Sequence, residues 1–129
     1  MLKQGILNPA LNHLLARVRH TNTLVIADRG FPSWPGLETV DISLVDGIPT
    51  VADVLRALKA QAVFGRAWMA EEFLAVNGPD ALASVKAVLG DTPLVLEGHV
   101  ALKQRVPGAI GLIRTADTLH FSNLILESA

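Results

Sequence analysis

The sequence predicts an α/β fold in which helices pack on a β-sheet, and three observations indicate it. Apolar residues at helical spacing alternate along the chain with short β-branched segments, a pattern typical of layered α/β proteins. Half of the 129 residues are hydrophobic and the mean hydropathy is +0.40, which suits a buried core or a subunit that covers surface in an oligomer. No repeat, low-complexity tract or linker interrupts the chain, so we expect one domain.

The first expected helix begins at Asn8, whose side chain can cap it, and Pro9 suits the first helical position. Apolar residues then recur at spacings of three and four, as one face of a helix requires. They are Leu11, Leu14, Leu15 and Val18. We expect the helix to end near Arg19 and His20, because positive charge is favourable at the carboxyl end of a helix dipole.

A buried strand is expected over residues 23–27, because this segment is apolar and β-branched and is followed by the turn residues 28–30. Two prolines and a glycine predict a loop over residues 31–38. Weak alternation of apolar and polar residues predicts a second strand over residues 39–44, and residues 46–49 mark the turn after it.

Thr50 begins the next expected helix, since its hydroxyl can cap the helix and Asp53 gives a start that resembles a capping box. The inner face of this helix is formed by Val51, Val54, Leu55 and Leu58. The remaining elements follow from the same signals. They are strands over residues 62–69, 93–96, 109–114 and 123–126, and helices over residues 79–89 and 100–105.

The composition excludes several classes of protein. The chain has no cysteine, which excludes disulfides, thiolate metal sites and cysteine nucleophiles. Its 11 basic and 12 acidic residues give a net charge of −1, so no nucleic-acid surface is indicated. No apolar run approaches the about 18–20 residues of a spanning helix and no secretory signal pattern is present, so we expect a cytoplasmic protein without a membrane partner. The common metal, nucleotide and hydrolase motifs are absent, so we expect neither a metal nor a cofactor.

Titratable residues at the ends of expected elements are the candidates for chemistry. His13 lies between apolar positions of the first helix and is expected on the surface, whereas His20 precedes the 23–27 strand and Asp28 follows it. Individually, His20 can be a helix-dipole partner and Asp28 a turn former. Strand residues advance about 3.3 Å each, so the two side chains are not expected to meet along one strand. Either His20 folds back over the sheet, or the two serve different parts of a site, or the site is shared between subunits.

Two further groups lie near the ends of later elements. His99 follows a glycine at the start of a short helix, where it can act as a cap or face a site, and Lys103 shares its helix face if that helix forms. Polar residues at 114–117 and 120–123 flank the last loop, where such clusters are often turn chemistry.

Several motifs, taken in chain order, resemble those of one protein family. Residues 19–32, RHTNTLVIADRGFP, are similar to its signature G-H-T-D-x-[IL]-V-[IV]-x-D-A-G-[LF]-P. Further similar segments are VDISL at 40–44, GIP at 47–49, AEE at 70–72, GHVALK at 98–103, IRTAD at 113–117 and FSNLIL at 121–126. The family is that of D-ribose pyranase and L-fucose mutarotase (RbsD/FucU), and the resemblance covers almost the whole chain.

The resemblance implies a single three-layer domain over residues 1–129, with a central mixed β-sheet flanked by helices. It also implies a cofactor-independent isomerase that interconverts the pyranose, furanose or anomeric forms of a monosaccharide such as ribose or fucose. Members of the family form homo-oligomers, commonly decamers of two pentameric rings, with sites between subunits. The implied partners are therefore a monosaccharide and further copies of the chain.

The resemblance assigns roles to individual residues as well. The family's catalytic histidine falls on His20, and its substrate-binding positions fall on Asp28, His99, Lys103, Phe121, Ser122 and Asn123. Opening a cyclic hemiacetal requires one proton to leave the anomeric hydroxyl and another to reach the ring oxygen. An imidazole, with an ordinary pKa of about 6.5, can act as either acid or base near neutral pH. Carboxylate, amide and ammonium groups hold sugar hydroxyls by hydrogen bonds.

The chain departs from the family pattern at several positions. Phe121 stands where the family has tyrosine, and Arg29 stands where it has alanine. Arg29 and Trp34 flank the expected site and are candidates for substrate specificity, although an arginine there also suits a surface ion pair. The alternative function is a non-catalytic sugar-binding or transport-associated module of the same fold. A structural oligomer that has lost its site is the third interpretation.

Overall fold

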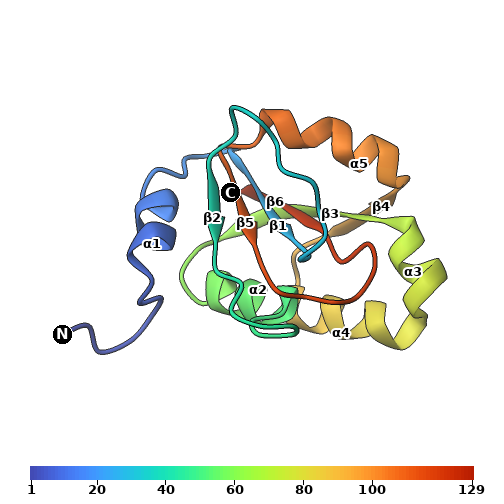
Figure 1. The fold of residues 1–129 in the computed structure, drawn as a ribbon, viewed down its shortest axis with the longest axis horizontal. Helices are drawn as coiled ribbons and strands as arrows, with labels where there is room; N and C mark the ends of the chain where they lie inside the picture. Colours follow the sequence, from blue (N-terminus) through green and yellow to red (C-terminus); the bar gives the residue numbers. More distant parts are fainter.

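A six-stranded β-sheet forms the centre of the protein, which we describe from a computed structural model of residues 1–129 (Figure 1). The strands are β1 (Thr23–Ala27), β2 (Thr39–Asp41), β3 (Phe64–Ala70), β4 (Leu94–Glu97), β5 (Gly111–Arg114) and β6 (Leu124–Ser128). The helices are α1 (Pro9–Leu15), α2 (Val51–Lys59), α3 (Glu71–Asn77), α4 (Pro79–Leu89) and α5 (His99–Arg105), followed by a short 3₁₀ turn, Val106–Gly108.

The sheet is mixed, as the family resemblance implies. The strand order is β2-β5-β1-β6-β3-β4, and β6 pairs antiparallel with both of its neighbours, β1 and β3. The other pairs, β2·β5, β5·β1 and β3·β4, are parallel. All strands except β6 therefore point the same way, and their carboxyl ends share one edge of the sheet with the amino end of β6.

Helices cover both faces of the sheet, which confirms the three-layer arrangement. In Figure 1, α5 lies on one side of the sheet, and α2 and α4 lie on the opposite side. Alternate residues of β1 explain the two layers, because Leu24 and Ile26 pack in the core beneath α2 and α4, whereas Val25 and Ala27 pack with Leu102 of α5. Residues of a strand buried on both faces are apolar without interruption, as this segment is.

Local capping signals place the starts of two helices where the sequence predicts them. The Asn8 side chain accepts a hydrogen bond from the Leu11 N–H at 2.9 Å, with Pro9 in the first turn. Thr50 and Asp53 form a reciprocal capping box, with bonds of 3.1 and 2.9 Å. These contacts satisfy N–H groups that have no partner inside a helix.

The first helix is shorter than expected. It ends at Leu15, and the Arg17 and Val18 N–H groups bond to carbonyls three residues earlier, as in a tight final turn. Thr21 then adopts a φ of +64° and the chain enters β1. His20 lies exposed in this turn, five residues beyond the helix, so its interpretation as a helix-dipole partner is wrong.

Two other elements differ from the prediction. Helix α3 was not expected, because Ala70 provides no side-chain cap and Phe73 is the only fully buried residue of the helix. The second strand ends at Asp41 rather than at residue 44. There the Asp41 carboxylate accepts hydrogen bonds from the backbone N–H and the hydroxyl of Ser43, which close a local turn.

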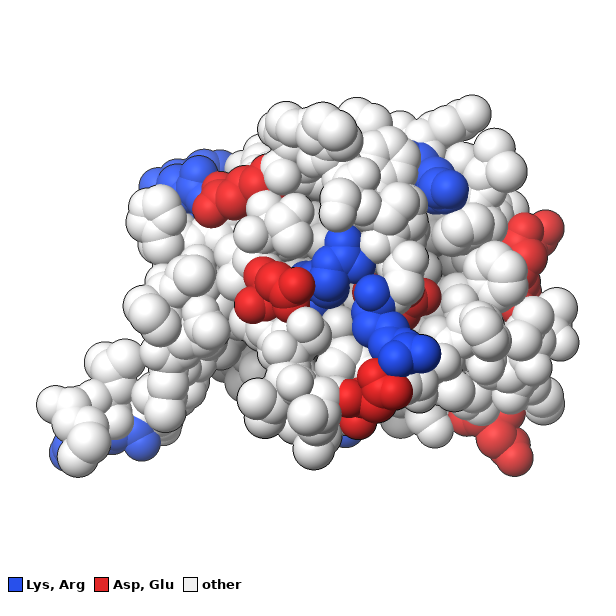
Figure 2. Space-filling view, in the orientation of Figure 1, with Lys and Arg blue, Asp and Glu red and all other residues white.

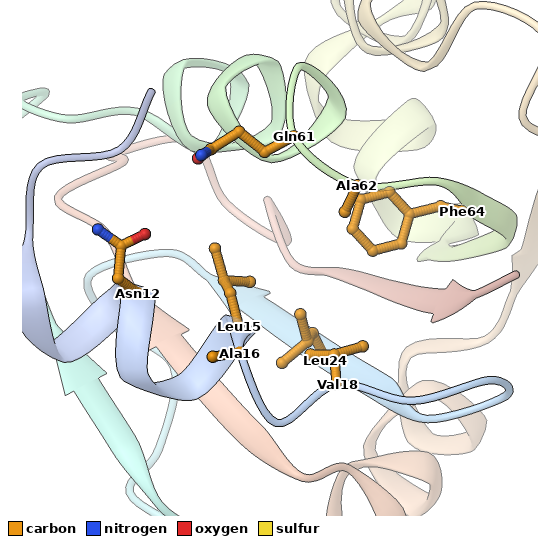
Figure 3. Close-up of a pocket in the computed structure, with 8 residues that line it drawn as sticks. All are labelled: Asn12, Leu15, Ala16, Val18, Leu24, Gln61, Ala62 and Phe64. Atoms are coloured by element: carbon orange, nitrogen blue, oxygen red, sulfur yellow. The ribbon is translucent and has the colours of Figure 1, made fainter. Parts of the chain in front are cut away.

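An apolar cavity of about 270 Å³ lies between α1 and the connection from α2 to β3 (Figure 3). Gln61 at its rim accepts a hydrogen bond from the Ile6 N–H at 3.0 Å, and Asn12 donates one to the Ile6 carbonyl at 2.6 Å. The cavity contains no titratable side chain. The residues that line it therefore supply no acid or base for catalysis.

The surface shows no extended patch of one charge on the face in Figure 2, where acidic and basic groups lie side by side. The ion pair between Arg29 and Asp46, 2.6 Å apart, is one such neighbouring pair. None of the helices combines the length and the apolar character that crossing a membrane requires.

Gly111 of β5 provides a test of the packing. A Cβ atom at this position would lie 2.6 Å from a methyl group of Leu14, which is completely buried. We predict that Gly111→Ala lowers the free energy of unfolding by about 1–3 kcal/mol, because the completely buried Leu14 would have to shift within the packed core. Urea unfolding followed by circular dichroism measures this.

Gly65 of β3 is the matched control. A Cβ atom there makes only an ordinary contact of 3.5 Å with Ala129, so Gly65→Ala should change the stability by no more than about 0.5 kcal/mol. Equal stabilities of the two variants would contradict the proposed clash with Leu14.

Candidate functional site

A cavity of about 200 Å³ opens at the edge of the sheet where β1 and β4 end and β6 begins. This is the edge at which open α/β sheets bind ligands, because the loops after parallel strands converge there. Three chain segments line the cavity: residues 28–32, the start of α5, and the loop before β6. The lining residues are Asp28, Gly30, Phe31, Pro32, His99, His120, Phe121 and Asn123.

Asp28 and Asn123 form a reciprocal pair at the base of this cavity. The Asp28 backbone N–H donates to the Asn123 side-chain oxygen at 2.9 Å, and the Asn123 side-chain N–H donates to the Asp28 carboxylate at 3.1 Å. The Gly30 N–H donates to the other carboxylate oxygen at 2.9 Å, as expected of a turn former. Burial raises the pKa of Asp28, and these hydrogen bonds oppose the rise.

Arg114 fixes the loop that follows Asp28. Its guanidinium donates to the Phe31 carbonyl at 2.6 Å and to the Asp28 carbonyl at 3.4 Å. Because Arg114 is the last residue of β5, it holds the 28–32 loop against the neighbouring strand. The wall of the cavity is therefore tied to the sheet.

His99 lies between two phenylalanine rings. Its ring centroid is 5.1 Å from that of Phe121 and 6.3 Å from that of Phe31, both at an interplanar angle of 80°. Its Nδ1 atom is buried and has no hydrogen-bond partner in the chain. The residue as a whole is half-buried and lines the cavity.

The expected capping role of His99 is wrong. Gly98 is the N-cap of α5, and no side chain caps this helix. Instead, the His99 backbone N–H donates to both carboxylate oxygens of Glu72, at 2.9 and 3.1 Å. This hydrogen bond is the main reason that the pKa of Glu72 is lowered, and it connects the first turns of α3 and α5.

The loop before β6 carries Phe121 in an uncommon backbone conformation, with a φ of +60°. The Asn123 N–H bonds to the Phe121 carbonyl at 2.8 Å, and Asn77 of α3 donates to the His120 carbonyl at 2.8 Å. Ser122 points away from the cavity, because its buried hydroxyl donates to the Asp117 carboxylate at 3.3 Å. Only Phe121 and Asn123 of the expected 121–123 segment line the cavity.

The other sequence-predicted residues lie elsewhere. His20 lies at the opposite edge of the sheet, where the N–H of the next residue, Thr21, bonds to the Ser128 carbonyl at the end of β6. Lys103 and Trp34 line a separate, shallow cavity of about 470 Å³. Arg29 lines a smaller neighbouring cavity of about 160 Å³ and pairs with Asp46. One chain thus brings together Asp28, His99, Phe121 and Asn123, but not the remaining candidates.

His120 is a cavity residue that the sequence interpretation placed in the polar 120–123 group but did not assign to the site. It borders both the main cavity and the neighbouring one. The available signal is its position directly before Phe121, in a loop that the motif comparison already assigns to the site. Gly30, Phe31 and Pro32 also line the cavity, within the 19–32 signature.

The lining suits a small, polyhydroxylated ligand. It combines a carboxylate, an amide and two imidazoles, which donate and accept hydrogen bonds, with apolar faces from Phe31 and Phe121. No three histidine or carboxylate side chains converge so that they could hold a metal ion.

Comparisons with known proteins match the chain over nearly its whole length. The chain is 39% identical to a D-ribose pyranase of Geobacillus thermodenitrificans over 99% of the chain and 96% of that protein. It is 36% identical to a D-ribose pyranase of Corynebacterium glutamicum over 99% of the chain and 97% of that protein.

Solved structures with the same fold include RbsD of Bacillus subtilis complexed with D-ribose. It has a TM-score of 0.93 and 29% identity, and the match covers 100% of this chain and 98% of that one. The fucose mutarotase of Streptococcus pneumoniae in complex with L-fucose also shares the fold, with a TM-score of 0.82 and 17% identity. The match covers 99% of this chain and 98% of that one.

A family model matches the chain from end to end, over residues 1–129; it describes the RbsD / FucU transport protein family. Together with the similarity to full-length relatives, this match shows that the chain belongs to the RbsD/FucU family.

Proposed function

We propose that this chain is a single-domain, cofactor-independent monosaccharide mutarotase that interconverts the ring forms of D-ribose or a related sugar. The observation that carries the proposal is the convergence of Asp28, His99, Phe121 and Asn123 on one cavity at the carboxyl edge of the sheet. Family membership and the D-ribose pyranase relatives support the same reaction class.

The side chains of the cavity suit the binding of a sugar ring. The Asp28 carboxylate and the His99 imidazole can form hydrogen bonds with sugar hydroxyls, and the Phe121 ring offers an apolar face. Because these groups are already held by Asn123, Glu72 and Arg114, binding needs little rearrangement. The cavity then positions the anomeric hydroxyl and the ring oxygen for proton transfer.

His20 is the proposed general acid and base, and it acts from a second copy of the chain. The five residues of β1 advance about 3.3 Å each, so His20 and Asp28 of one chain stand at opposite ends of the strand. A homo-oligomer that places the β1 start of one subunit at the cavity of another brings the two together. Exposed Leu7, Leu44 and Val63 provide apolar surface for such contacts.

A decamer of two pentameric rings is the assembly that we propose from the family resemblance. Within one chain, four of the expected site residues do not line the main cavity: Lys103, Ser122, Arg29 and Trp34. For Lys103 and Trp34, any contact with the sugar depends on this assembly. Arg29 remains a candidate for specificity through the neighbouring cavity.

The alternative is a sugar-binding or transport-associated module that does not catalyse the interconversion. Phe121 favours it, because a phenylalanine provides no hydroxyl for a proton relay or a hydrogen bond. Calorimetry with D-ribose and an anomerisation assay on the same sample separate the two functions. Binding without any increase in the interconversion rate would support the alternative.

Substitution of His20 tests the catalytic role. We predict that His20→Ala slows the interconversion of D-ribose forms by about 100-fold or more, because general acid–base catalysis contributes a factor of this size. Saturation-transfer NMR measures the exchange rate. His13→Ala is the matched control, since His13 is also exposed but lies on α1, away from the cavity, and it should exchange at the wild-type rate. A fully active His20→Ala protein would refute the assignment.

Mixed assemblies test whether the site lies between subunits. His20→Ala and Asp28→Ala should each be inactive as pure oligomers. Co-assembled in equal amounts, they should regain about one quarter of the wild-type activity, because a quarter of the interfaces then pair an intact His20 with an intact Asp28. Exchange rates of the purified mixture, with its size checked by light scattering, measure this. No recovery in mixed oligomers would contradict a site shared between subunits.

A further inference from the structure

His120 stands between two adjoining cavities. The main cavity of about 200 Å³ and the neighbouring cavity of about 160 Å³ share three lining residues, Asp28, Gly30 and His120. Asp28 and Gly30 are fixed by the hydrogen bonds that they make with Asn123 and with each other. Of the three shared residues, His120 is therefore the one whose side chain is free to contact a ligand.

The backbone of His120 is held by a hydrogen bond, whereas its imidazole has no hydrogen-bond partner in the chain. The His120 carbonyl accepts the hydrogen bond from Asn77 at 2.8 Å, and Asn77 itself is tied to the Phe73 carbonyl at 3.1 Å. The imidazole forms no hydrogen bond with the chain, although it is exposed at the cavity mouth. Truncating the side chain therefore removes no contact that the fold needs.

The charged side chains that line the neighbouring cavity already have partners within the protein. Arg29 forms its ion pair with Asp46. The Asp117 carboxylate accepts hydrogen bonds from the backbone N–H groups of Val51 and Leu119, both at 2.9 Å. Among the lining residues, only the Thr118 side chain and the His120 imidazole are polar groups without such partners. The cavity therefore suits a neutral hydroxyl group better than an anion.

We propose that His120 determines which sugars the site accepts, by forming a hydrogen bond with the ring in the main cavity and limiting access to the neighbouring one. The proposal rests on the proposed mutarotase function. In this arrangement the pentose ring occupies the main cavity, and a substituent on carbon 5 enters the neighbouring cavity past His120, which both cavities share. Replacement of His120 by alanine removes the imidazole between the two cavities and joins them.

A pair of sugars isolates this effect. D-allopyranose has the configuration of D-ribopyranose at carbons 2, 3 and 4 and carries one additional hydroxymethyl group on carbon 5. The ratio of kcat/KM for D-allose to that for D-ribose therefore measures how the site treats this single group. One group of about this size changes selectivity by a factor of about 10 or more in a fitted pocket.

The experiment compares wild type, His120→Ala, His120→Gln and His13→Ala by saturation-transfer NMR with both sugars. We expect His120→Ala to raise the allose-to-ribose ratio by about tenfold, and His120→Gln, which keeps length and hydrogen bonding, to stay near wild type. His13→Ala should match wild type, because His13 lies on α1. An unchanged ratio in His120→Ala, with wild type active on D-ribose, overturns this inference alone. A wild-type protein inactive on both sugars overturns the mutarotase function and this inference with it.

Discussion

The reciprocal hydrogen bonds between Asp28 and Asn123 are the contact on which the arrangement of the site depends. They join the carboxyl end of β1 to the amino end of β6, two neighbouring central strands that are 95 residues apart in sequence at this point. The Asn123 amide satisfies both a backbone N–H and a carboxylate oxygen of Asp28. A buried carboxylate is tolerated there because hydrogen bonds replace the water it has lost.

The single antiparallel strand explains why the last loop reaches the site. In an entirely parallel sheet, the loop before β6 would arrive at the opposite edge, far from the ends of β1 and β4. Since β6 runs the other way, Phe121 and Asn123 arrive beside Asp28 and His99. Arg114 and Glu72 then hold the two neighbouring segments, so that each wall of the cavity is fixed by a different strand or helix.

The features that could be predicted from the sequence are those with local causes. Asn8, Thr50 and Asp53 act on residues three positions away, and the apolar 23–27 segment gives its strand directly. Helix α3 has no such signal, since it lacks a side-chain cap. The bond from the His99 N–H to Glu72 joins residues 27 positions apart, so no pattern within one segment reveals it. His120 was not assigned to the site for a related reason, because its place between two cavities depends on how the loops meet.

The two non-glycine residues with positive φ, Thr21 and Phe121, each follow a histidine, and they lie at opposite edges of the sheet. Such a conformation costs a side-chain-bearing residue of the order of 1–3 kcal/mol, and glycine would adopt it without that cost. Glycine at position 121 would remove this backbone cost, but it would also remove the Phe121 ring, which contacts His99 and packs against both hydrophobic clusters. The packing of the Phe121 ring therefore offsets the strain of its own backbone, and it holds the conformation of the loop that carries His120.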